Sequence, residues 1–169
     1  MKKNYTRFIV YAAVIAALYA VLTHLQNILL PGSASMAIQM RISEALCVLA
    51  FFTPAAIPGL SIGCLVFNLT FAGTLPLDFL VGTLATYLAA QGMWLTRNLT
   101  VKGYPLLGML LPALTNAILV GWELAVYIGG GFLLNAVYVA IGEAVVLLVL
   151  GTALYYALKR RSLAEKLFS

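Results

Sequence analysis

Two glutamates inside long apolar stretches, Glu123 and Glu143, are the residues best suited to chemistry in this sequence. A charged side chain at the centre of a membrane-spanning helix costs about 2.5–3.5 kcal/mol on insertion scales, so such an acid is a functional candidate. A carboxylate accepts two parallel N–H hydrogen bonds at once. No Lys or Arg is near either acid in sequence. The pair therefore predicts a site for a cationic solute, or for one with a row of hydrogen-bond donors.

Other polar residues are expected to collect beside these acids, mostly in the outer half of the membrane, as judged from about 1.5 Å of rise per residue. The candidates are Gln39, Arg41, Glu44, Asn68, Asn116 and Tyr138. The end of the first helix, His24 to Asn27, is expected at the membrane interface. Two alternatives stay open: the asparagines could bond one helix to another, and Arg41 with Glu44 could form a structural ion pair.

Motifs for catalysis or metal binding are absent from the sequence. It has no His-Glu-x-x-His, no Gly-x-Ser-x-Gly and no Walker-type glycine loop, and it has one histidine. Cys47 and Cys64 lie in apolar stretches without metal-ligand spacing. We therefore expect neither an enzyme nor a metal or cofactor site, and any energy source must belong to a partner.

The composition places the chain in a membrane. Of its 169 residues, 63% are apolar and 9% are charged, whereas soluble domains carry about 45–50% and about 25%. A spanning helix needs about 20 apolar residues, so six would use roughly 120. We predict an all-α membrane protein, residues 1–169 forming a single six-helix transmembrane domain. The predicted helices are about 6–27, 38–53, 57–71, 77–96, 106–128 and 132–158.

The basic residues predict the topology. With six spans, nine of the ten fall on one face: Lys2, Lys3, Arg7, Arg97, Lys102, Lys159, Arg160, Arg161 and Lys166. The positive-inside rule makes that face, and both termini, cytoplasmic. The net charge of +5 is thereby explained by topology, and no nucleic-acid partner is expected. Arg41 falls on the opposite face, which calls for a local explanation.

Small residues recur along one side of the first helix. Ala12, Ala16 and Ala20 are four apart, and Ala13 and Ala17 lie alongside. Such spacing lets another helix approach closely. That helix could belong to a partner protein or to the same bundle.

Several segments resemble the QueT family. Residues 39–46 (QMRISEAL) and 51–59 (FFTPAAIPG) resemble its signature, and residues 116–124 with Gly142-Glu143 resemble its later segments. The resemblance covers about residues 8–155. It is a family of queuosine-precursor transporters that serve as S components, the substrate-binding subunits of energy-coupling factor (ECF) importers.

The resemblance implies a six-helix bundle of the S-component type in the plasma membrane of a prokaryote. Its solute would bind at the outer face, under a lid of about residues 30–40. The alanine surface of the first helix would dock on a transmembrane coupling subunit, and two ATPase subunits would drive import. The implied ligand is 7-aminomethyl-7-deazaguanine or a similar 7-deazaguanine.

Roles for the site residues follow as hypotheses. Glu123 or Glu143 would accept the paired donors of the base, and the other acid, or Glu44, would bind the aminomethyl cation. The amides of Asn68, Asn116 and Gln39 would bond the carbonyl and pyrrole groups, Arg41 would order the lid through Glu44, and Tyr138 would offer a stacking face. The alternatives are an S component for another vitamin-like solute, a stand-alone carrier or channel in which the two acids relay ions, and, last, an intramembrane enzyme.

Overall fold

The computed structural model describes every residue except 1–4, 32, 34–39, 72, 161–166 and 169, and all the elements of regular secondary structure in the described chain are helices. Its elements are α1 (Tyr5–Leu29), the 3₁₀ helix η1 (Ile42–Phe51), α2 (Ala56–Thr70), α3 (Asp78–Thr96), α4 (Leu106–Tyr127), α5 (Phe132–Val146), the π-helical turn η2 (Leu147–Gly151) and α6 (Thr152–Arg160). The elements α5, η2 and α6 follow one another without a break. The predicted all-α fold class is confirmed.

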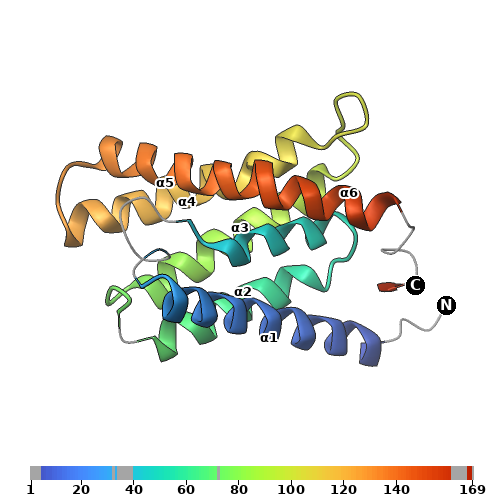
Figure 1. The fold of residues 1–169 in the computed structure, drawn as a ribbon, viewed down its shortest axis with the longest axis horizontal. Coiled ribbons are helices and arrows are strands. Elements are labelled where there is room, and N and C mark those ends of the chain that lie inside the picture. Colours follow the sequence, from blue (N-terminus) through green and yellow to red (C-terminus); the bar gives the residue numbers. More distant parts are fainter. Residues whose placement is uncertain (1–4, 32, 34–39, 72, 161–166, 169) are drawn as a thin grey trace.

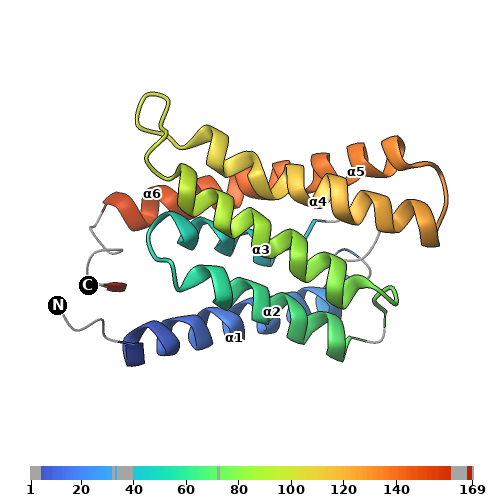
Figure 2. The same cartoon turned by 180° about the vertical axis from the view of Figure 1, so that it is seen from behind.

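The short helix η1 is the centre of the molecule. It contacts every other helical element, and Cys47, Val48 and Ala50 on it are fully buried. Around it, α1 to α5 pack in chain order, each against the next, as Figures 1 and 2 show. No contact joins α1 to α5 or α6 in the described chain. The surrounding helices therefore form an open ring, with η1 filling its middle.

Three helices are long and apolar enough to cross a membrane: α1, α4 and the continuous Phe132–Arg160. The apolar α2 has 15 residues, about 22 Å at 1.5 Å per residue, and η1 has 10, about 20 Å as a 3₁₀ helix. Both are shorter than the roughly 30 Å hydrocarbon layer. The structure thus supports a membrane protein with three candidate spans, and crossing by all six predicted helices stays a prediction.

The second helix begins later than predicted and is of another type. Met40 and Arg41 precede the helix, which starts at Ile42, and Arg41 has an extended backbone with φ −75° and ψ 105°. The Met40 amide donates to the Ser33 carbonyl at 3.0 Å, so this stretch bonds to the connection before it instead of starting a helical turn. The remaining residues of the predicted start, 38 and 39, lie outside the described chain.

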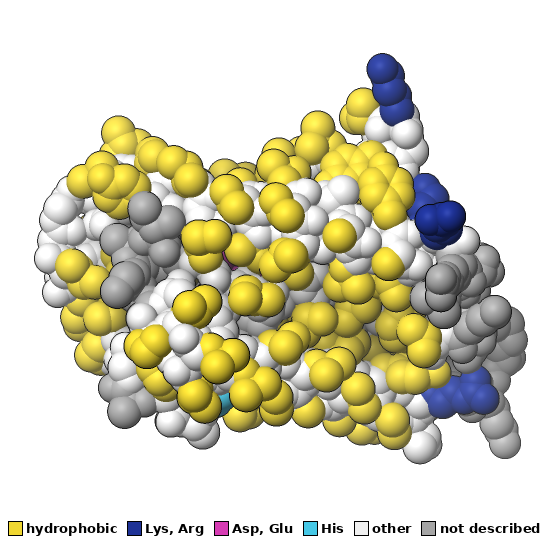
Figure 3. Space-filling model, in the orientation of Figure 1, with side chains coloured by type: hydrophobic (Ala, Val, Ile, Leu, Met, Phe, Trp, Pro, Cys, Tyr) yellow, Lys and Arg dark blue, Asp and Glu magenta, His cyan; other side chains and the backbone are white. Residues whose placement is uncertain are grey.

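The charged residues divide the bundle into two ends. The Lys159 ammonium donates to the Gly103 carbonyl at 3.0 Å, and the Phe168 ring contacts Tyr11 near the start of α1, so these segments share one end. Figure 3 shows Lys and Arg side chains at that end and apolar side chains between the ends. Among the described basic residues, Arg41 alone lies away from it. The predicted separation holds for the basic residues that the structure describes; Lys2, Lys3, Arg161 and Lys166 lie outside the described chain. Which side of a membrane the basic end faces stays a prediction.

Close packing of α1 on α2 depends on two glycines. A Cβ at Gly63 would lie 2.7 Å from the Ala16 carbonyl oxygen, and one at Gly59 would lie 2.8 Å from the Ala12 carbonyl oxygen. Because both obstacles are backbone atoms, the helices could not keep this separation with larger residues. Small residues four apart on each helix therefore face one another inside the bundle.

Substituting Gly63 by alanine should destabilise the protein by about 1–3 kcal/mol, the usual cost of overpacking, because the new methyl group would press on the α1 backbone. Unfolding in detergent, followed by circular dichroism, would measure the loss. Gly92→Ala is the matched control, since its Cβ would meet the flexible end of Leu111 at 2.9 Å. A Gly63→Ala midpoint equal to that of the unchanged protein would refute the close-packing argument.

Candidate functional site

All four described acids are buried in one region of the bundle. Glu44, Asp78, Glu123 and Glu143 are each at most 3% exposed, although they come from four different elements. Electrostatic interaction links Glu123 with Asp78, and Glu143 with Glu44. By its position within or beside its helix, each is nearer to the end of the bundle opposite the basic residues than to the basic end. The structure therefore brings Glu123 and Glu143 into one acidic cluster.

The outer part of the cluster contains Asp78, Glu123 and Asn68, at the ends of α3, α4 and α2. Glu123 lies four residues before the end of α4; apart from the neighbouring carboxyl group of Asp78, no hydrogen-bond partner for either of its carboxylate oxygens lies in the described chain. Asp78 begins α3; its Oδ2 accepts from the Leu75 amide at 2.9 Å, and its Oδ1 has no such partner. Asn68 donates to the Asp78 carbonyl at 2.7 Å, which leaves its own Oδ1 without a donor.

The inner part contains Glu143 and Glu44. Glu143 is the twelfth residue of the helix that starts at Phe132, about 16 Å along it. Its Oε2 has no hydrogen-bond partner among the described residues. Glu44 is already bonded: Tyr19 donates to its Oε1, and the Cys47 thiol donates to its Oε2 at 3.1 Å. Glu143 is thus the better placed of the two to receive a ligand.

Arg41 corrects the hypothesis of acids without a basic neighbour. Although distant in sequence, it interacts electrostatically with Glu123 and Glu143, and also with Asp78 and Glu44. It is 3% exposed. A Cβ at Gly82 would lie 2.9 Å from Nδ2 of Asn68, so this glycine leaves room for the Asn68 amide beside the guanidinium. The position of Arg41 away from the other basic residues is explained: it sits among the acids. One guanidinium among four carboxyl groups still leaves acceptors in excess.

The remaining predicted residues are placed less uniformly. Asn116 is 4% exposed and its Nδ2 has no hydrogen-bond partner in the described chain. Tyr138 is half-buried on α5. Gln39 lies outside the described residues, as does most of the predicted lid of about residues 30–40. Asp78 was not among the predicted site residues, because an acid at a predicted helix start has an ordinary local explanation. Its interaction with Glu123 and its burial place it in the cluster.

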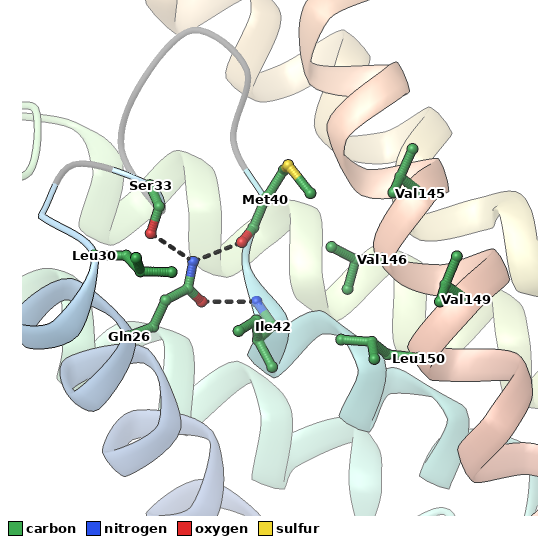
Figure 4. A pocket seen from close by; sticks show the side chains of 9 residues that line it. All are labelled: Gln26, Leu30, Ser33, Met40, Ile42, Val145, Val146, Val149 and Leu150. Atoms are coloured by element: carbon green, nitrogen blue, oxygen red, sulfur yellow. Dashed lines mark hydrogen bonds between the residues drawn. The ribbon is translucent and has the colours of Figure 1, made fainter.

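A lateral cavity of about 310 Å³ lies where the ring of helices is open. Gln26, Leu30 and Ile42 line one side, and Val146 and Leu150 of the last helix line the other, as Figure 4 shows. Glu123 and Glu143 are not among its lining residues. Glu143 nevertheless lies less than one turn before Val146 on the same helix, so the cavity passes close to the inner part of the cluster.

Gln26 joins the two ends of the connection between α1 and η1. Its amide nitrogen donates to the Ser33 hydroxyl at 2.9 Å and to the Met40 carbonyl at 2.6 Å, and its oxygen accepts from the Ile42 amide at 2.8 Å. Figure 4 shows all three bonds. The sequence placed Gln26 at the interface without a role, because one amide near a helix end does not reveal what it bonds. Gln26 thereby fixes where η1 begins, and with that the positions of Arg41 and Glu44.

A family model described as the QueT transporter matches residues 9–160. The chain belongs to the QueT transporter family. A curated relative, the queuosine precursor transporter QueT of Lactococcus lactis subsp. cremoris (strain MG1363), is 39% identical over 89 residues. That match covers 51% of this chain and 48% of the relative, so the two align over about half their lengths. No solved structure matches the chain.

Membership in the QueT family confirms the resemblance drawn from the sequence and places the chain in a family of transporters. The alanines proposed for partner contact divide into two groups in this QueT-family chain. Ala12, Ala16 and Ala20 are at most 9% exposed and are buried within the bundle, whereas Ala13 and Ala17 are exposed. A partner could reach only the second pair in this conformation.

Replacing Gln26 by leucine should loosen the start of η1 while leaving the α-helices folded, because the Ile42 amide and the Met40 carbonyl would lose their partner. A buried group left unsatisfied costs about 1–3 kcal/mol. Hydrogen–deuterium exchange should therefore speed up at Ile42. Gln91→Leu, on α3, is the control. Unchanged exchange at Ile42 in Gln26→Leu would show that this amide does not hold the connection.

Proposed function

We propose that this chain is the substrate-binding S component of an ECF-type importer. Its cargo is a 7-deazaguanine queuosine precursor, 7-aminomethyl-7-deazaguanine or a close analogue. The protein captures it at the extracellular face of a prokaryotic plasma membrane. The name of the Lactococcus relative, a queuosine precursor transporter, supports the substrate class, and family membership supports transport. The buried acidic cluster, with its unpartnered acceptors, is the observation that carries the proposal.

The ligand's chemistry matches that of the cluster. A guanine-like edge presents a ring N–H beside an exocyclic amine, and a carboxylate can accept both in parallel. The aminomethyl group adds an ammonium with three donors and no acceptor. Glu123 and Glu143 supply three carboxylate oxygens that accept no hydrogen bond from a donor in the described chain. A site of this kind rejects ligands that lack the donors, because its own buried groups would stay unpaired.

The location of the cluster supports capture from outside. The described basic residues other than Arg41 lie at the opposite end of the bundle, and the positive-inside rule makes that end cytoplasmic. The acidic cluster then faces the exterior, as an import subunit requires. The connection of about residues 30–40, with its two ends joined through Gln26, is proposed as the lid.

Energy for import would come from partners. The chain has no Walker-type glycine loop, the motif that cradles nucleotide phosphates. A transmembrane coupling subunit and two ATPase subunits of an ECF module would supply it. The exposed Ala13 and Ala17 on α1 are the proposed contact, since small residues let a partner helix approach closely.

Binding of 7-aminomethyl-7-deazaguanine to the purified protein should weaken when either glutamate becomes glutamine. Hydrogen bonds to charged groups contribute about 1.5–3 kcal/mol, so Glu123→Gln and Glu143→Gln should each raise the dissociation constant about 10- to 100-fold. Isothermal titration calorimetry measures this. Thr115→Val on α4 is the control, because its hydroxyl bonds only within its own helix, to Leu111 and Pro112. Unchanged affinity in both variants would remove the two acids from the site.

Uptake into vesicles should require the ATP-driven module. Proteoliposomes containing this chain alone should bind radiolabelled ligand but not accumulate it, whereas co-reconstitution with a coupling subunit and ATPases should give uptake that depends on ATP. A Walker-lysine variant of the ATPases is the control and should abolish accumulation. Accumulation by the chain alone would favour the stand-alone carrier instead.

A further inference from the structure

Four buried acceptor oxygens lie together where α2, α3 and α4 end or begin, and none has a described donor. They are Oδ1 of Asn68, Oδ1 of Asp78 and both carboxylate oxygens of Glu123. The three side chains are 5%, 3% and 0% exposed. Native proteins leave few buried polar atoms unpaired, and each such atom calls for an explanation. A group of four, all of them acceptors, indicates a missing donor-rich partner.

The surrounding bonds hold these acceptors in place without satisfying them. Asn68 is oriented by its bond to the Asp78 carbonyl at 2.7 Å, which turns the amide oxygen away from that contact. Asp78 is held by the Leu75 amide through Oδ2, which leaves Oδ1 for something else. The carboxyl groups of Asp78 and Glu123 lie close enough to interact with each other. Two carboxylates at such proximity are costly unless they share a proton or a cation accompanies them.

Arg41 supplies some of the positive charge but does not saturate the acceptor oxygens. It interacts with Asp78 and Glu123, and it also interacts with Glu44 and Glu143. A guanidinium is planar, with its donors in a fixed fork. Acceptors that come from three helices call for a compact donor that reaches in several directions. A primary ammonium, with three rotatable N–H donors and no acceptor, has that geometry.

We propose that Asp78, Glu123 and Asn68 form the subsite for the ligand's primary ammonium group, which makes Asp78 a specificity-determining residue. This inference rests on the proposed function and divides the cluster by task. Glu143, in the inner part, then takes the planar N–H pair of the base. Glu44 stays a positioning residue, because Tyr19 and Cys47 already bond its carboxylate.

The test compares two probes that share the base and differ in charge, 7-aminomethyl-7-deazaguanine and the neutral 7-cyano-7-deazaguanine. Calorimetry on the full-length protein should show that Asp78→Asn weakens binding of the ammonium ligand at least about tenfold and shifts the cyano ligand by less than about threefold. Asparagine keeps an oxygen that can accept from the Leu75 amide, so the start of α3 is preserved.

Two further variants make the result specific. Glu123→Gln should reproduce the selective loss, and it carries the test where Asp78→Asn does not yield folded protein. Glu143→Gln should weaken both probes about equally, because they share the base edge. Thr96→Val, at the other end of α3 and bonded within its own helix at Gly92 and Met93, should change neither.

The outcomes separate this inference from the proposed function. Equal loss for both probes in Asp78→Asn and Glu123→Gln, or no loss for either, would overturn the ammonium subsite while leaving the base-binding function in place. No binding of either probe to the unchanged protein would overturn the proposed function itself.

Discussion

The placement of four carboxyl groups around one guanidinium inside an apolar bundle is the constraint on which the rest of the structure depends. Burying a charge costs free energy. In a cluster with more acids than bases, much of that cost is not offset until another hydrogen-bond donor binds. Arg41 offsets part of it by interacting with all four acids. In the proposed function, a cationic, donor-rich solute would satisfy the remainder.

In this fold the short helix η1 lies in the middle of the ring of helices, where it can position charged residues. Because η1 begins inside the bundle, its first residues bring Arg41 and Glu44 to the ends of the surrounding helices. Gln26 fixes that beginning by bonding both sides of the connection, and Gly82 leaves space for the Asn68 amide beside Asp78. The same few side chains thus set the start of η1 and the shape of the proposed binding site.

Some residues of the site could be predicted because placing an acid in an apolar stretch costs free energy whatever surrounds it. An acid in a long apolar stretch is unusual wherever its neighbours lie, so Glu123 and Glu143 could be named from the sequence. Asp78 could not, because at a helix start it has an ordinary local explanation. The hydrogen bond between Tyr19 and Glu44, 25 residues apart, could not be predicted from the sequence of either segment. The alanines of α1 show the same limit: their spacing predicted a close helix, but whether it came from a partner or from α2 was not encoded in the spacing.

By itself the sequence determined the helical class, the membrane setting, the family and the separation of basic residues from acids, since each depends on composition, run length or motifs along the chain. Only the tertiary structure decided that Arg41 stands among the acids, that Glu44 is already bonded, and which acceptor oxygens are left for a ligand. Those facts depend on which helices pack together and how deeply each side chain is buried, and the energies that set them are interactions between residues far apart in the chain.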